Sequence, residues 1–325
     1  MKGKRRLNGL MNGLWIVNLT LCLLVGGVFY WFNTPPKAEA GFTKPVSTFA
    51  DNRPTWTPKP SITPVPPPVQ RPTITPWPTP SPGPSITPMV SAPSNRMVIG
   101  YSIEKRPQEV FRFGRGPVNK LNVAGIHGGS EWNTVELAGE LIAYLNDHPE
   151  RIPDDTSLFI LHDINPDGTA RAHGVDGRVN ANGVDLNRNW PYNWKADWPR
   201  DGCWIWRPVT GGSAGGSEPE IQNLITFIDK IKPVALISYH SAALGIFPGG
   251  KPDFPPSIAL AAAVAAVSDY PYPPLNTGCD YTGNMTDWAA NTRAIPAIDI
   301  ELTNHVDTDF DQNLKVLQAF LDWRP

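Results

Sequence analysis

The sequence predicts an α/β fold in which a mixed, mostly parallel central sheet is flanked by helices. From Met97 onward, short apolar runs typical of buried strands alternate with segments whose apolar residues recur at helical spacing. Two features set the preceding residues apart, an uncharged apolar run and a proline-rich segment. We therefore predict three parts: a transmembrane or signal helix (residues 1–36), a disordered linker (37–96) and a folded α/β domain (97–325).

Residues 1–36 are predicted to be a signal anchor or a signal peptide. Four basic residues among the first six precede an apolar centre of 19 residues, 14–32. At about 1.5 Å per residue, such a helix just crosses a hydrocarbon core of about 30 Å. Basic residues before it place the rest of the chain outside the cytoplasm. A signal cleaved near Ala40 is the alternative. We expect an extracellular or cell-envelope protein, anchored by one helix or, if cleaved, secreted.

Residues 37–96 are predicted to form an extended, disordered linker. Of the 44 residues from Asn52 to Asn95, 15 are proline and none is acidic. Proline fixes φ and lacks an amide hydrogen, so this segment should form neither helix nor sheet. It should be polyproline II, at about 3.1 Å per residue. Such a spacer suits a tether that holds a domain away from a membrane.

Within residues 97–325, the pattern predicts four strands and four helices. The strands are expected at residues 121–126, 158–164, 234–239 and 295–302. The helices are expected at residues 134–145, 218–231, 256–268 and 311–323. Ser217 is predicted to cap the second of these helices, and Glu220 to complete a capping box.

The composition excludes several classes of protein. With 28 basic and 30 acidic residues the net charge is −2, which argues against a nucleic-acid partner. Three cysteines are too few for a disulfide scaffold or for a zinc site of four thiolates. Cys22 lies in the apolar run, which leaves Cys203 and Cys279. These two either form a disulfide or remain separate buried thiols.

Polar side chains stand where the predicted strands end. His127 and Glu131 follow the first strand, His240 follows the third, and Glu301 lies near the end of the fourth. In such sheets, catalytic and ligand-binding residues lie beyond the carboxyl ends of the strands. Two imidazoles and one carboxylate can hold one Zn²⁺ and leave a fourth position for water. Arg178 and the pair 187–188 add hydrogen-bond donors between these positions.

Six short blocks connect these residues to a known family. They are GIHGGSE at 125–131, NPDG at 165–168, GVDLNRN at 183–189, SEPE at 217–220, SYHS at 238–241 and IEL at 300–302. In these blocks the chain resembles the zinc carboxypeptidases of the pancreatic type, a family that includes exported bacterial members and murein-peptide amidases. The resemblance extends from about residue 99 to the C-terminus and implies a zinc carboxypeptidase-like fold.

The resemblance implies a role for each residue of the candidate metal site. His127, Glu131 and His240 match the zinc ligands. Glu301 matches the general base, and Arg178 matches the arginine that polarises the scissile carbonyl. The family usually spaces its first two ligands His-x-x-Glu, whereas here the glutamate comes four residues after the histidine. The two glycines at 128–129 are expected to absorb the extra residue.

The resemblance also implies how substrate is bound. Asn187 and Arg188 match the pair that grips the terminal carboxylate of the substrate. Tyr281 takes the place of the family's mobile tyrosine, although it precedes the Asp-Trp pair at 287–288 at a shorter spacing. Thr286 stands where relatives line the side-chain pocket and brings no acid to select basic side chains. An acid from elsewhere in the fold could still supply that charge.

The resemblance therefore implies an exported zinc metallocarboxypeptidase that hydrolyses C-terminal residues of peptides. One alternative is a murein-peptide amidase or endopeptidase of the same fold, which would cut cell-wall peptides around a diamino acid. Another is a deacylase of N-acyl amino acids, against which the export segment counts. A fourth possibility, from a different class, is a wall-binding module that has lost its metal.

Overall fold

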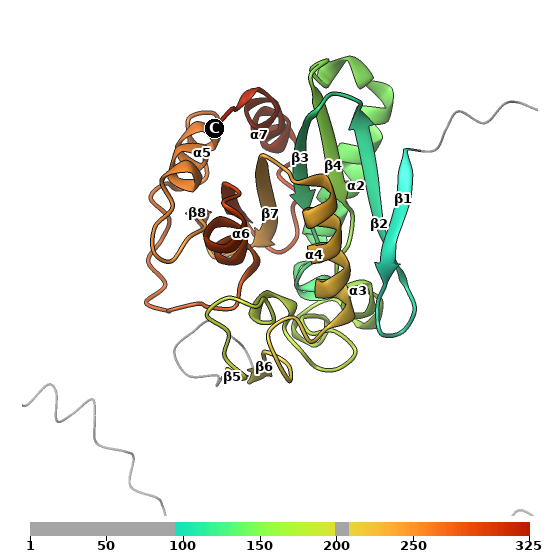
Figure 1. Ribbon diagram of the computed structural model, residues 1–325, viewed down its shortest axis with the longest axis vertical. Coiled ribbons are helices and arrows are strands. Elements are labelled where there is room, and N and C mark those ends of the chain that lie inside the picture. Colours follow the sequence, from blue (N-terminus) through green and yellow to red (C-terminus); the bar gives the residue numbers. More distant parts are fainter. Residues whose placement is uncertain (1–94, 199–207) are drawn as a thin grey trace, which may run out of the picture. The chain divides into compact units, whose positions relative to one another are not determined.

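The computed structural model describes residues 95–198 and 208–325 (Figure 1). The predicted N-terminal helix, all but the last two residues of the predicted linker, and Cys203 lie outside these residues. The disulfide and the boundaries of the three parts therefore stay predictions. Within the described ranges, no helix combines the length and apolar character needed to cross a membrane.

A mixed sheet forms the centre of the described region and contains seven strands there, in the order β1-β2-β4-β3-β7-β9-β8. The four central strands are parallel: β4 (Thr156–Leu161), β3 (Val118–Val123), β7 (Ala235–Ser241) and β9 (Ala297–Leu302). The edge strands pair antiparallel: β1 (Arg96–Tyr101), β2 (Pro107–Gly114) and β8 (Gly245–Pro248). The predicted mixed, mostly parallel sheet is confirmed.

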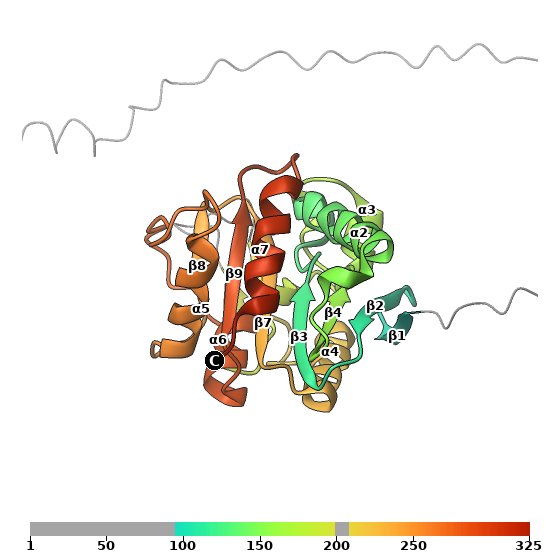
Figure 2. The ribbon, with the colours of Figure 1, turned by 90° about the horizontal axis from the view of Figure 1, so that it is seen from above.

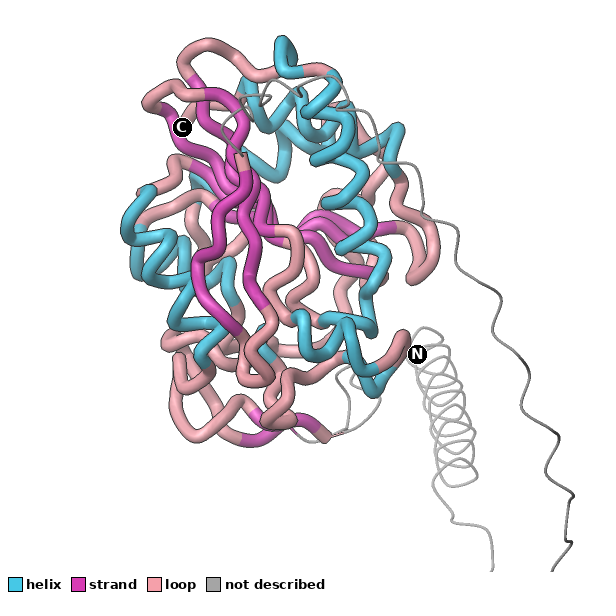
Figure 3. The backbone as a smooth tube through the Cα atoms, turned by 90° about the vertical axis from the view of Figure 1, so that its right-hand side faces the viewer, coloured by secondary structure: helices cyan, strands magenta, loops and turns pink. Residues whose placement is uncertain are grey.

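Helices cover both faces of this sheet (Figures 2 and 3). One face is covered by α2 (Trp132–Asp147), α5 (Pro255–Ala265) and α7 (Phe310–Asp322). The other is covered by α4 (Pro219–Ile231) and α6 (Met285–Arg293). Each predicted helix overlaps one of these, whereas β1, β2, β8 and α6 were not predicted.

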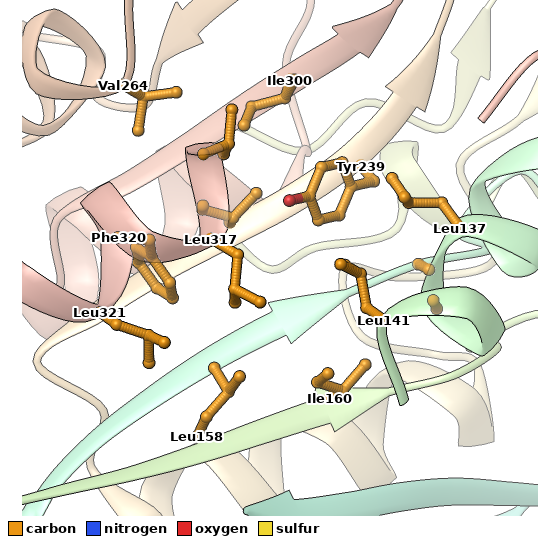
Figure 4. Close-up of a cluster of buried hydrophobic side chains, with 14 of the residues drawn as sticks. Leu137, Leu141, Leu158, Ile160, Tyr239, Val264, Ile300, Leu317, Phe320 and Leu321 are labelled. Atoms are coloured by element: carbon orange, nitrogen blue, oxygen red, sulfur yellow. The ribbon is translucent and has the colours of Figure 1, made fainter. Parts of the chain in front are cut away.

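The side chains of the central strands divide between two cores. In β4, Leu158 and Ile160 pack with α2 and α7, whereas Phe159 and Leu161 pack with α4. This alternation follows from the two-residue period of a strand. Figure 4 shows the first core, in which Tyr239 of β7 lies among leucines and isoleucines of the helices and neighbouring strands. Strands buried on both faces explain the continuous apolar runs of the sequence.

Short elements fill the loops beyond the strands. They are α3 (Pro166–Arg171), the 3₁₀ helices Gly128–Glu131, Pro149–Arg151, Val175–Gly177 and Leu186–Arg188, and the strand pair β5 (Asp197–Trp198) and β6 (Val209–Thr210). The two 3₁₀ helices Gly128–Glu131 and Leu186–Arg188 carry predicted site residues.

The predicted capping of α4 is wrong. The N-cap residue is Glu218, and no side chain caps the helix. Ser217 Oγ instead donates to Glu218 Oε1 at 2.7 Å, and Glu220 Oε1 accepts from the amide of Ile103 at 3.2 Å. The side chains of Ser217 and Glu220, which the local sequence assigns to the cap, are therefore hydrogen-bonded to other partners.

Lys120 of β3 is fully buried and closes the end of α7. Its Nζ donates to the carbonyls of Leu321 (2.9 Å) and Trp323 (2.6 Å), and also to that of Phe320. The last carbonyls of a helix have no partner within the helix and attract positive charge. Burial lowers the pKa of Lys120 to about 8.

We expect Lys120→Met to lower the free energy of unfolding by about 1–3 kcal/mol, because buried carbonyls would lose their donor. Urea unfolding followed by circular dichroism measures this. Lys315→Met, on the exposed side of the same helix, is the matched control and should change stability by less than about 0.5 kcal/mol. Equal unfolding midpoints for the two variants would show that the buried ammonium contributes nothing.

Candidate zinc and substrate site

A cavity of about 260 Å³ lies at the carboxyl ends of the parallel strands. All eight predicted site residues line it: His127, Glu131, Arg178, Asn187, Arg188, His240, Tyr281 and Glu301. The structure therefore brings together residues that are far apart in the chain. Their individual roles stay predictions.

Three buried side chains form the candidate metal site. His127, Glu131 and His240 each offer one ligand atom, and these atoms lie within 4.8 Å of one another. Glu131 Oε2 is 3.3 Å from His240 Nδ1, and Glu131 Oε1 is 4.0 Å from His127 Nε2. Two imidazoles and a carboxylate are a donor set that catalytic zinc sites use. The residues present therefore fit zinc.

The double glycine accommodates the unusual ligand spacing. Gly128 has φ of +46°, a left-handed conformation that favours glycine. A Cβ on Gly129 would come within 1.9 Å of the carbonyl oxygen of Ala172. The 3₁₀ helix Gly128–Glu131 turns tightly through these positions and brings Glu131 back towards His127. The extra residue between the two ligands is therefore contained in this turn.

Each candidate histidine ligand has a carboxylate at its other ring nitrogen. Asp185 Oδ1 lies 3.3 Å from His127 Nδ1, and Asp299 Oδ1 lies 3.4 Å from His240 Nε2. His240 Nε2 also lies 2.9 Å from Ser238 Oγ. Such partners fix the tautomer and the orientation of a metal-binding imidazole.

Neither aspartate was predicted to belong to the site, although the sequence contains signals for both. Asp185 stands inside the quoted block GVDLNRN. Asp299 precedes Glu301 by two residues in β9, so both side chains project from the same face of the strand.

Two of the three candidate ligands carry the protonation state that a metal ligand needs. Burial alone would raise the pKa of Glu131, but His127, His240 and Arg178 outweigh it and hold this pKa at about 2. Burial and the neighbouring Arg178 lower the pKa of His127, which keeps its imidazole neutral. Burial would also lower the pKa of His240, but Asp299 and Glu131 raise it above its usual value. Glu131 is thus ionised and His127 is in the form that binds metals.

Glu301 has the properties of a group that exchanges protons near neutral pH. Burial, supported by the charge of Glu131 and opposed by that of His240, raises the pKa of its carboxyl to about 7. Its Oε2 accepts a hydrogen bond from the amide of Ala243 at 2.9 Å. Glu301 is also the register partner of His240 in the neighbouring strand. An acid–base catalyst works best with a pKa near the working pH.

Arg178 borders the candidate metal site and is held in place there. Its Nε donates to Asp185 Oδ2 at 2.9 Å. Its Nη1 lies 3.4 Å from Glu131 Oε1, and its Nη2 lies 3.2 Å from His127 Nε2. A fixed positive charge therefore stands beside the three candidate ligands.

Arg188 lines the same cavity and contacts two aromatic rings. Its side-chain Cζ is 4.7 Å from the ring centroid of Trp198 and 4.7 Å from that of Tyr281. Its Nη1 donates to the carbonyl of Asn187 at 2.8 Å. Cation–π contacts of this kind hold a guanidinium plane in a defined orientation. Tyr281, whose match to the family was the weakest, thus lies against the predicted carboxylate-binding residue.

Lys251 and His305 are among the further residues that line the cavity without having been predicted there. Lys251 Nζ donates to Asp280 Oδ1 at 2.8 Å and to the carbonyl of Tyr281. His305, which has no place in the six sequence blocks, has its Nδ1 3.1 Å from Ser241 Oγ. Neither residue follows a predicted strand directly, so the sequence held no positional signal for them.

Comparison with known proteins identifies the same family as the six sequence blocks. The profile of the zinc carboxypeptidase family matches residues 91–318. "Murein peptide amidase A" of Escherichia coli K12 is 33% identical over 129 residues, which cover 37% of this chain and 48% of that protein. The "Carboxypeptidase N catalytic chain" of Rattus norvegicus is 30% identical over 174 residues, covering 45% of this chain and 37% of that protein. The chain thus spans half or less of either relative's length in these alignments.

A solved structure shares the fold. The murein-tripeptide amidase of Escherichia coli O157 superposes with a TM-score of 0.52 at 24% identity. The superposition covers 72% of this chain and 94% of that one. At this level of identity the likeness shows the fold alone.

Proposed function

Because the chain belongs to the zinc carboxypeptidase family, we propose that it is an exported metallocarboxypeptidase that removes C-terminal residues from peptides. The observation that carries this proposal is that Arg188 lines the same cavity as His127, Glu131 and His240. A guanidinium offers two parallel donors to a carboxylate. A peptide whose terminal carboxylate binds Arg188 would therefore enter the cavity that holds the metal site.

Separate residues of the cavity lining would carry out the separate steps of peptide hydrolysis. His127, Glu131 and His240 would hold zinc, which when bound polarises a carbonyl and lowers the pKa of water to about 7. Glu301 would take the proton of the attacking water on Oε1, because Oε2 accepts from Ala243, and would return it to the leaving amine. Arg178 would stabilise the negative charge that develops on the carbonyl oxygen.

We expect peptides with an amidated C-terminus to be poor substrates, because they lack the carboxylate that Arg188 binds. Arg188→Ala should raise KM for free-acid peptides roughly 10- to 100-fold, with a smaller change in kcat, because a charged hydrogen-bond donor is lost. Steady-state kinetics on paired free-acid and amidated peptides measures both effects. Arg324→Ala, which removes an exposed arginine paired with Asp155, is the control and should leave KM unchanged. Equal cleavage of amidated and free-acid peptides would contradict carboxypeptidase activity.

The second candidate function is a murein-peptide amidase or endopeptidase. The similarity to the murein peptide amidase of Escherichia coli favours it. Digesting free peptides and purified murein side by side separates the two enzymes. A metal-free wall-binding module requires a lost metal site, whereas all three candidate ligands are present. Elemental analysis of zinc in the purified protein tests that possibility.

The proposal of export rests on the sequence before the catalytic domain. An apolar centre at residues 14–32 follows four basic residues, and a proline-rich spacer follows it. Protease added to intact cells should digest the spacer if the domain lies outside the membrane. Protection until the cells are broken would contradict export. The N-terminal sequence of the mature protein would show whether the helix is cleaved near Ala40.

A further inference from the structure

We infer that His305 binds the peptide as a hydrogen-bond acceptor for an amide N–H on the N-terminal side of the scissile bond. This inference rests on the proposed hydrolysis of peptides. It concerns a residue of the cavity lining to which neither the six sequence blocks nor the family roles assign a function. The argument depends on the tautomer of the His305 imidazole, which the hydrogen bonds around Ser241 determine.

The side chain of Asn133, at the start of α2, is fully buried and can adopt only one amide orientation. Its Nδ2 donates to the carbonyl of Asn304 at 2.8 Å and to that of Asp307 at 2.9 Å. The reverse orientation would place the side-chain oxygen against two carbonyl oxygens, which can only accept. The atom of Asn133 that meets Ser241 is therefore the acceptor Oδ1.

The hydroxyl of Ser241 connects Asn133 to His305. Its Oγ lies 2.9 Å from Asn133 Oδ1 and 3.1 Å from His305 Nδ1. A hydroxyl has one hydrogen to donate, and burial makes an acceptor without a donor costly. The hydrogen of Ser241 therefore goes to the buried Asn133 Oδ1. The oxygen of Ser241 is then left to accept from His305 Nδ1.

His305 is thereby held in the tautomer that carries its hydrogen on Nδ1. In a neutral imidazole one ring nitrogen donates and the other accepts, so Nε2 keeps its lone pair. Within residues 95–198 and 208–325, the only hydrogen-bond partner of the ring is Ser241, at Nδ1. The side chain is exposed and lines the cavity. A donor that enters the cavity can therefore bond to Nε2.

The loop that carries His305 is fixed before any substrate binds. Asn133 holds two of its carbonyls, those of Asn304 and Asp307. Asn304 Oδ1 in turn accepts from the amides of Val306 and Asp307, both at 2.7 Å. These contacts surround His305 in the chain on both sides. A group that is already in place loses little conformational freedom when it binds a ligand.

The neighbours of His305 indicate which part of a peptide it would meet. Its partner Ser241 directly follows the candidate ligand His240, and the amide of Ser241 donates to Glu131 Oε2 at 3.1 Å. Arg188, which would hold the terminal carboxylate, lies against aromatic rings of other loops. A peptide that spans from Arg188 across the metal site would reach His305 with the residues before the scissile bond. An amide N–H that leaves water there needs an acceptor, and Nε2 supplies one.

The tautomer is tested in the protein without substrate. Nitrogen-15 spectra of the histidine side chains, recorded in mildly alkaline buffer, distinguish a hydrogen on Nδ1 from one on Nε2, and His305→Phe identifies the resonance. We expect the Nδ1–H form in the unaltered protein. Ser241→Ala removes the acceptor of this hydrogen and should reduce the population of that form. A dominant Nε2–H form in the unaltered protein would overturn the inference, because Nε2 would then be a donor.

The bond to substrate is tested by removing its two partners separately. An ester replaces the peptide bond whose N–H belongs to the first or to the second residue before the scissile bond. His305→Asn removes Nε2 but leaves a side-chain amide that can donate to Ser241. For one of the two esters we expect kcat/KM to fall roughly 3- to 10-fold in the unaltered protein and hardly at all in His305→Asn.

Two further variants make this experiment specific. His305→Gln can place a carbonyl oxygen near the position of Nε2 and should keep part of the difference between ester and amide. His148→Asn, at an exposed histidine outside the cavity lining that pairs with Glu150, is the control and should keep all of it. Esters cleaved as fast as the amides, or an equal loss in His305→Asn, would show that Nε2 accepts no hydrogen bond from the peptide.

Failure of this inference can be told from failure of the proposed function. Cleavage of free-acid peptides with no penalty for either ester would refute the role of His305 but keep the carboxypeptidase. Equal cleavage of amidated and free-acid peptides would refute the carboxypeptidase. The tautomer of His305 and its coupling to a peptide N–H would still be measurable on the peptides that are cleaved.

Discussion

Replacing Glu131 by alanine is expected to lower the affinity for zinc by more than about 100-fold. Loss of a residue that merely orients a metal ligand costs 10- to 100-fold in affinity, and loss of a ligand should exceed this. Glu131 is the one carboxylate among the three candidate ligands, and its low pKa keeps it charged across the physiological range. Zinc per chain after dialysis against buffered free zinc measures the effect.

Glu136→Ala provides the matched control for this variant. Glu136 lies on the exposed side of α2, five residues further along the chain, and should leave zinc content near one per chain. Circular dichroism of both variants shows whether the fold is kept. Unchanged zinc affinity in Glu131→Ala would mean that another acid completes the site and that the four-residue spacing has displaced Glu131 from the metal.

Much of the candidate site could be predicted because its residues follow strands of one sheet. The carboxyl ends of parallel strands meet at one edge, so His127, His240 and Glu301 had to lie near one another once those strands were identified. The long apolar runs marked β4, β7 and β9 for the same reason, since these strands are buried on both faces. The parallel order of β3, β7 and β9 thus places residues that are distant in the chain next to one another.

The remaining features depend on contacts between distant parts of the chain. Thr286 of α6 donates a hydrogen bond to Asp299 of β9, and no local sequence pattern indicates that the two side chains meet. Glu220 had a strong local signal for a capping box, but the amide of Ile103, more than a hundred residues earlier, takes its side chain. Local rules describe what a side chain can do, and tertiary packing decides which of its partners is within reach.

The roles of Glu131 and Glu301 should separate cleanly, because both carboxylates line the cavity but only Glu131 belongs to the candidate ligand set. Glu301→Gln keeps the shape of the side chain and can still accept from Ala243, but it cannot take up a proton. We therefore expect zinc to remain near one per chain while kcat falls.

The fall in kcat for Glu301→Gln should lie towards the upper end of the 10²- to 10⁴-fold range for lost acid–base catalysis, because the same carboxyl would both take the proton and return it. KM should change little, since neither Arg188 nor its aromatic neighbours are touched. Elemental analysis and steady-state kinetics on one free-acid peptide measure both quantities. Glu140→Gln, at an exposed position of α2, is the control and should behave as the unaltered protein. If Glu301→Gln loses zinc as Glu131→Ala does, Glu301 is a ligand; if it keeps both zinc and kcat, the proton passes through another group.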